Sequence, residues 1–106
     1  MKGFDPQSMM AQAKKMKDGL SRVRADLKER MVEGAAAGGM VTVISNGLSE
    51  VQSVRIRKEA VNPDDVDMLE DLVIVALRAA MEKAKALEEA ETGKVTGGMG
   101  GLGGML

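Results

Sequence analysis

Six apolar residues near the start of the chain are spaced alternately four and three positions apart: Met9, Ala13, Met16, Leu20, Val23 and Leu27. This heptad spacing places them along one side of an α-helix and excludes a β-strand, in which side chains alternate with a period of two. Asp5 and Pro6 suit the N-cap and the first position of that helix. The sequence therefore predicts a first helix of about 22 residues with a narrow seam that needs a partner. Gly19 lies in mid-helix, either for close packing against a partner helix or as a tolerated weak position.

The periodicity changes to two after this helix. Segments 32–36, 40–45 and 50–57 predict three antiparallel strands, the second of them rich in β-branched residues. Asn46-Gly47 separates the second and third strands and predicts a tight two-residue hairpin turn. In the third strand Val54 and Ile56 alternate with Arg55 and Arg57, so the arginines are expected on the opposite face.

A second long helix is predicted from Asn62-Pro63, with apolar positions from Leu69 to Leu87, to an end near Thr92-Gly93. Residues 97–106 contain six glycines and no charge, which predicts a flexible Gly/Met-rich tail. We therefore predict one α+β domain over residues 1–96, built as a long helix, a three-stranded antiparallel sheet and a long helix. These elements leave apolar surface uncovered in a single chain, so a homodimer is predicted.

Composition excludes several functional classes. The chain has no cysteine or histidine and one aromatic residue, Phe4. Disulfides, most zinc sites and Ser-His triads are therefore absent, and a base-stacking platform for single strands is disfavoured. The acids between Asp64 and Asp71 lack the spacing of a calcium loop and suit the start of a helix. We expect no enzyme activity, no cofactor, no metal and no small-molecule substrate.

No segment reaches the ~18 apolar residues of a membrane span, and the N-terminus lacks the apolar region of a signal peptide. These two observations predict a cytoplasmic protein with no membrane partner. The ten methionines leave a further alternative open. They either fill the core and the dimer seam or form an adaptable surface for a partner protein.

Charge is distributed unevenly along the chain. Residues 1–30 carry a net charge of +4 and residues 60–106 a net charge of −5. The basic residues of the first helix are expected to occupy one broad flank, and they are Lys14, Lys15, Lys17, Arg22, Arg24 and Lys28. Such a flank either tracks DNA phosphates or is the solvated surface of a coiled coil. A second cluster, Arg55, Arg57 and Lys58, either contacts phosphates or protects a sheet edge from aggregation.

Four stretches, in their order and spacing, resemble the YbaB/EbfC family of bacterial nucleoid-associated proteins. They are 10–16, 39–43 running to Asn46-Gly47, 54–56 and 67–72. The resemblance implies a tweezer-like homodimer that binds double-stranded DNA in the cytoplasm, spread over the nucleoid. The resemblance makes the nine basic residues candidate contacts to DNA, without sequence specificity. It also implies that the protein helps organise the nucleoid. The alternative is a protein-interaction adaptor that uses the Met-rich helix and does not bind DNA.

Overall fold

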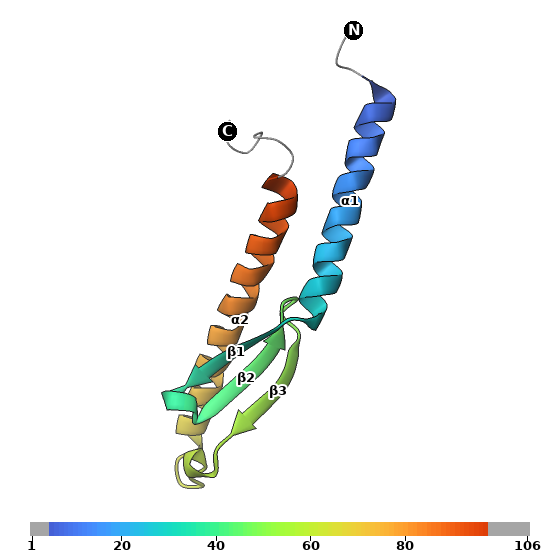
Figure 1. The fold of residues 1–106 in the computed structure, drawn as a ribbon. Coiled ribbons are helices and arrows are strands. Elements are labelled where there is room, and N and C mark those ends of the chain that lie inside the picture. Colours follow the sequence, from blue (N-terminus) through green and yellow to red (C-terminus); the bar gives the residue numbers. More distant parts are fainter. Residues whose placement is uncertain (1–4, 98–106) are drawn as a thin grey trace.

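The computed structural model describes residues 5–97. Helix α1 (Pro6–Glu29) leads into strands β1 (Met31–Ala36), β2 (Val41–Asn46) and β3 (Val51–Ile56), and helix α2 (Val66–Gly97) follows. Two 3-10 turns, Ala37–Gly39 and Lys58–Ala60, lie between β1 and β2 and after β3. The strands form one antiparallel sheet in the order β1-β2-β3 (Figure 1). This arrangement confirms the predicted α+β class and order of elements, while the homodimer stays a prediction.

Helix α1 begins where the sequence predicts. The Asp5 side chain accepts a hydrogen bond of 3.0 Å from the Gln7 backbone N–H, which satisfies one free donor of the first turn. Helix α1 packs against α2, and its seam from Met16 to Leu27 is half-buried or buried, so the partner helix of α1 is in the same chain. At Gly19 an added Cβ would lie 2.9 Å from Val95 Cγ1, which confirms close packing there. Helix α1 extends past α2 (Figure 1), and Met9 in that part is 49% exposed.

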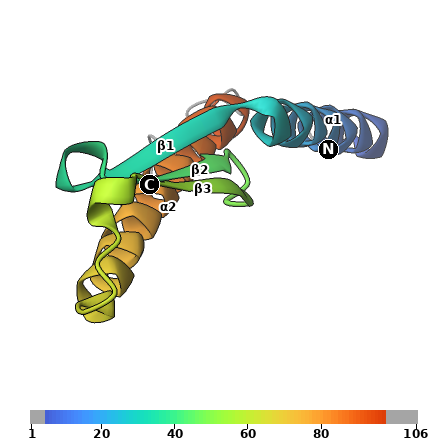
Figure 2. The same cartoon turned by 90° about the horizontal axis from the view of Figure 1, so that it is seen from below.

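Helix α2 covers one face of β1 and β2 (Figure 2). Val41 and Val43 are fully buried beneath it, and Ala76 and Ala80 of α2 complete the core with Ala36 of β1. Because the helix presents alanines to the sheet, its backbone approaches closely. A Cβ on Gly34 would collide with the backbone of Ala76 and Ala80.

Strand β3 forms an edge that α2 leaves uncovered. All six of its residues are exposed, with Val54 at 48% and Ile56 at 40%. The register pairs Val54 with Val43 and Ile56 with Val41, so these side chains share the core side of the sheet. Arg55 pairs with Thr42 and lies on the other side, as the alternation predicts.

The predicted two-residue turn at Asn46-Gly47 is wrong. Asn46 is the last residue of β2, residues 47–50 form the loop, and the residue with positive φ is Ser49, at 65°. Gly47 is needed for another reason, because an added Cβ would lie 2.8 Å from Leu27 Cδ2. Its backbone N–H donates to the carbonyls of Leu27 and Arg30, at 2.8 and 2.9 Å. The loop is therefore fastened to the end of α1.

The predicted bounds of the second helix also need correction. Asn62 forms a turn in which its side chain accepts from the Asp64 N–H, and Asp65 instead caps α2 by accepting from the Met68 N–H at 3.2 Å. The helix continues through Gly93 to Gly97, where the sequence predicted an end near residue 93. The predicted tail beyond Gly97 lies outside the described residues. Within residues 5–97 neither helix combines the length and hydropathy needed to cross a bilayer.

A small ion-pair network joins α2 to the end of α1. Glu91 accepts from Arg30 at 3.0 Å and from Lys94 at 3.1 Å. The hydrogen bond from Lys94, followed by that from Arg30, lowers the pKa of Glu91 below its ordinary value of 4.5. The charged form of Glu91 is therefore favoured in the folded state.

We expect this network to stabilise the fold only while Glu91 is charged. A carboxylate whose pKa is lowered by folding contributes stability above its unfolded pKa and loses it as pH falls through the folded value. Glu91→Gln should therefore be less stable than the parent at neutral pH, with a difference that disappears as pH falls below about 4.5. Urea denaturation across a pH series measures this difference, and a difference that is constant with pH would contradict the prediction.

Candidate nucleic-acid interface

The basic residues of α1 lie on two sides of the helix. At about 100° per residue, Lys14, Lys17, Arg24 and Lys28 fall within a sector of about 80°. Lys15 and Arg22 lie about 130° from the centre of that sector. The expectation of one broad flank is therefore wrong, because an interval of one residue along a helix carries a side chain around to another face.

We call the first group, with Ser21, the basic stripe: Lys14, Lys17, Ser21, Arg24 and Lys28. These residues are spaced alternately three and four apart, so they form a line about 21 Å long on exposed helix surface. Asp18, Asp26 and Glu29 fall on the side of Lys15 and Arg22, which leaves the stripe free of acids. Among the described residues, no carboxylate is within ion-pair distance of the four stripe cations. Their charges are therefore available to an external anion.

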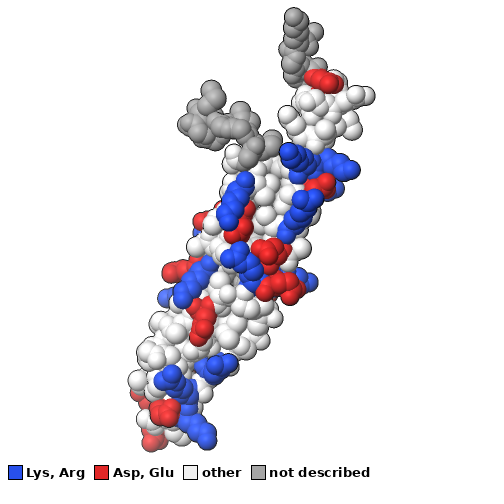
Figure 3. All heavy atoms as spheres, viewed as in Figure 1, with Lys and Arg blue, Asp and Glu red and all other residues white. Residues whose placement is uncertain are grey.

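The remainder of the surface is mixed. On the face shown in Figure 3, basic and acidic side chains alternate along both helices and no continuous basic area is visible. This mixture agrees with a net charge of −1 for the whole chain. The separation of charge occurs along one line of α1 and not over a whole face of the molecule.

The structure does not bring the second basic cluster to the stripe. Arg55 lies on β3, and Arg57 and Lys58 follow its end, at the end of the strand away from the loop that contacts α1 (Figure 1). The Arg57 guanidinium packs on the turn before β2, where a Cβ on Gly39 would lie 3.2 Å from Arg57 Nη2. Strand β3 separates the two groups by about 20 Å.

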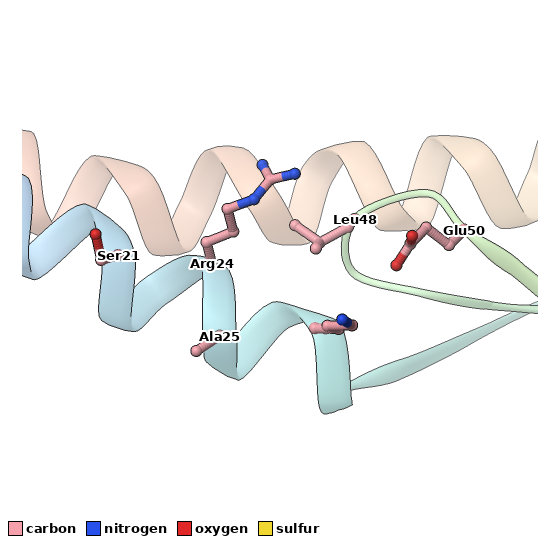
Figure 4. A pocket seen from close by; sticks show the side chains of 6 residues that line it. Ser21, Arg24, Ala25, Leu48 and Glu50 are labelled. Carbon is pink, nitrogen blue, oxygen red and sulfur yellow. The ribbon is translucent and has the colours of Figure 1, made fainter.

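A hollow of about 350 Å³ lies at the sheet end of the stripe. Ser21, Arg24, Ala25 and Lys28 of α1 line one wall, and Leu48 and Glu50 of the β2–β3 loop line the other. Figure 4 shows the Arg24 side chain extending toward Leu48, with the Glu50 carboxylate directed into the space. The sequence alone does not indicate Ser21, Leu48 and Glu50, because only the folded chain brings the loop beside α1.

Asn46 fixes the loop wall of this hollow. Its side-chain N–H donates to the Lys28 carbonyl at 3.2 Å and to Glu50 Oε1 at 2.7 Å. Its side-chain oxygen accepts from the N–H groups of Leu48 and Glu50, both at 3.0 Å. Asn46 is only 2% exposed, so these bonds are sheltered from water. The loop wall of the hollow therefore has a fixed backbone position.

Comparison with known proteins identifies the family. The sequence profile of the YbaB/EbfC DNA-binding family matches residues 1–99. The chain belongs to the YbaB/EbfC DNA-binding family. A nucleoid-associated protein from Acetivibrio thermocellus is 42% identical to it over 104 residues, which is 98% of this chain and 92% of that protein. A nucleoid-associated protein from Ruminiclostridium cellulolyticum is 38% identical over 104 residues, which is 98% of this chain and 90% of that protein. The predicted resemblance is confirmed, and YbaB/EbfC is not an enzyme family.

A solved structure has a similar fold. The crystal structure of an uncharacterized protein, HP0035 from Helicobacter pylori, matches this chain with a TM-score of 0.72. The match covers 92% of this chain and 99% of that one, at 24% sequence identity. At this identity the likeness concerns the fold alone.

Proposed function

We propose that this protein is a nucleoid-associated protein that binds double-stranded DNA through the basic stripe of α1, with little sequence specificity, and helps organise the nucleoid in the cytoplasm. The observation that carries the proposal is the line of four cations that, within residues 5–97, have no carboxylate partner. Cations that neutralise phosphates release counterions, which drives binding to any sequence. The names of the YbaB/EbfC relatives agree with this function.

We propose that the binding unit is a homodimer. Strand β3 has unpaired backbone groups along its outer edge and exposed apolar side chains at Val54 and Ile56. Helix α2 also exposes Ile74 and Val75. A second copy of the chain would cover this surface, and two-fold symmetry would double the basic stripe. Light scattering should give twice the chain mass of 11.2 kDa, and a single-chain mass would contradict the homodimer.

A comparison of two double variants of α1 tests the DNA interface. Lys14→Gln/Lys17→Gln removes two charges from the stripe, and Lys15→Gln/Arg22→Gln removes two charges from the other side of the same helix. In mobility shifts of a DNA duplex from low to physiological salt, Lys14→Gln/Lys17→Gln should bind more weakly than the parent. It should also reduce the slope of log K against log salt by about 1 for each phosphate that is no longer neutralised. Lys15→Gln/Arg22→Gln should change the DNA affinity and the salt slope much less.

Three outcomes would contradict the proposal. Equal losses in the two double variants would exclude the stripe as the interface, and absence of binding by the parent at low salt would exclude DNA binding. Binding that does not respond to salt would favour apolar contacts with a partner and hence the adaptor alternative. Far-UV circular dichroism and light scattering on each variant verify that the fold and the oligomer are intact.

A further inference from the structure

The basic stripe ends in the hollow between α1 and the β2–β3 loop, and this position suggests a more specific role for it. We propose that the hollow is the seat of one backbone phosphate of the bound duplex, held by Ser21, Arg24 and Lys28. This inference rests on the proposed DNA binding and assigns one particular phosphate contact within it. The remaining stripe cations, Lys14 and Lys17, then follow the same DNA backbone along α1.

Three donors from successive turns of α1 face the hollow. Ser21 supplies a hydroxyl, Arg24 a planar fork of N–H groups that matches phosphate oxygens, and Lys28 a compact ammonium. Neither cation has a carboxylate partner in the part of the chain that the structure describes. A phosphate entering here therefore gains charge-assisted hydrogen bonds without first breaking an ion pair.

The loop wall distinguishes this site from the rest of the stripe. All four stripe cations are exposed, but Lys14 and Lys17 are not among the residues that line the hollow, so water and salt screen their attraction for phosphates from every open side. At the hollow, Leu48 stands opposite Arg24 and would shield one side of a bound phosphate from water (Figure 4). The Asn46 hydrogen bonds hold this wall in place before DNA arrives, so little conformational entropy is lost on binding. Arg24 and Lys28 should therefore contribute more to binding than an equal number of charges at Lys14 and Lys17.

Glu50 gives the proposal its sharpest test. Its carboxylate lines the same hollow and repels an anion, while its Oε1 accepts from the Asn46 side chain. Glu50→Gln removes the charge and keeps an oxygen that can accept this hydrogen bond. If the hollow holds a phosphate, this substitution should tighten DNA binding. A purely structural role for Glu50 gives no reason for binding to tighten.

The experiment measures duplex DNA affinity by fluorescence anisotropy at one low salt concentration, using the full-length parent, Arg24→Gln/Lys28→Gln, Lys14→Gln/Lys17→Gln and Glu50→Gln. The two double variants remove equal charge from one stripe, and they differ in position and in the loss of the Arg24 guanidinium. We expect Arg24→Gln/Lys28→Gln to weaken binding about tenfold more than Lys14→Gln/Lys17→Gln. Glu50→Gln should tighten binding about two- to fivefold.

Equal losses in the two double variants, or no tightening in Glu50→Gln, would overturn the phosphate seat while DNA binding stands. If the parent does not bind, both the seat and the proposed function fail. A further arm adds inorganic phosphate at millimolar concentration to the bound duplex, at constant ionic strength. A lone phosphate cannot contact the whole stripe, so little DNA should be displaced. If inorganic phosphate displaces the duplex from the parent but not from Arg24→Gln/Lys28→Gln, the hollow is a site for free phosphate and the inference is overturned.

Discussion

Replacing Gly34 with alanine is expected to destabilise the protein by about 3 kcal/mol or more. The new methyl group would collide with the carbonyl oxygen of Ala76 and the backbone nitrogen of Ala80, and it would lie 2.8 Å from Ala80 Cα. These are backbone atoms in the middle of α2, so no side-chain rotation relieves the contact. The helix must move away from the sheet, which opens the core around Val43. Urea denaturation followed by far-UV circular dichroism measures the loss.

Gly93→Ala is the matched control for Gly34→Ala. Gly93 also lies within a regular element, but an added Cβ at Gly93 meets nothing within 4 Å. Alanine favours a helix over glycine, so this substitution should stabilise the protein by about 0.5–1 kcal/mol. The same chemical change is therefore expected to have opposite effects at the two positions. A Gly34→Ala protein as stable as the parent would show that α2 does not pack on β1 this closely.

Asn46→Ala is expected to cost about 2–4 kcal/mol, because several polar groups lose their partner at once. The Lys28 carbonyl loses a side-chain donor, and the N–H groups of Leu48 and Glu50 lose their acceptor. The same substitution should weaken DNA binding if the loop wall shapes the phosphate seat. Urea denaturation measures the first effect, and fluorescence anisotropy under conditions where the variant is folded measures the second.

Asn62→Ala provides a control at an exposed asparagine. Asn62 makes one side-chain hydrogen bond, from the Asp64 N–H in the turn before α2, so its loss should cost about 0.5–1 kcal/mol. DNA binding should not change, because this turn lies at the far end of the molecule from the stripe (Figure 1). If Asn46→Ala and Asn62→Ala lose equal stability, the hydrogen bonds of Asn46 contribute no more than the single one of Asn62, which would contradict the prediction.

Much of the fold was predictable because the hydrophobic period changes twice along the chain. The seam from Met9 to Leu27 specifies a helix, and the alternation of Val54 and Ile56 gives the correct faces of β3. The errors arose where several residues compete for one role. Asn62, Asp64 and Asp65 can each cap a helix, and only the folded backbone selects Asp65. Asn46-Gly47 matches a turn motif, yet packing against Leu27 decides the conformation of the loop.

The candidate site was predictable in part. The basic character of α1 is visible in the sequence, and helical geometry alone could have separated Lys15 and Arg22 from the stripe. The hollow was not predictable, since Leu48 and Glu50 reach α1 through contacts made by Gly47 and Asn46 across about 20 residues of chain. Nothing local to Ser21 indicates that a loop lies opposite to it.

The junction between α1 and the sheet also decides how the molecule carries mechanical load. If DNA lies along the proposed stripe, tension on the duplex reaches α1, and β2 and its loop are bonded to the last turn of α1 and to Arg30 through the Leu27, Lys28 and Arg30 carbonyls. The three acceptors lie within residues 27–30, so these hydrogen bonds are close together at the end of α1. Force applied to α1 would therefore reach the sheet at this joint, ahead of the alanine-lined core between the sheet and α2.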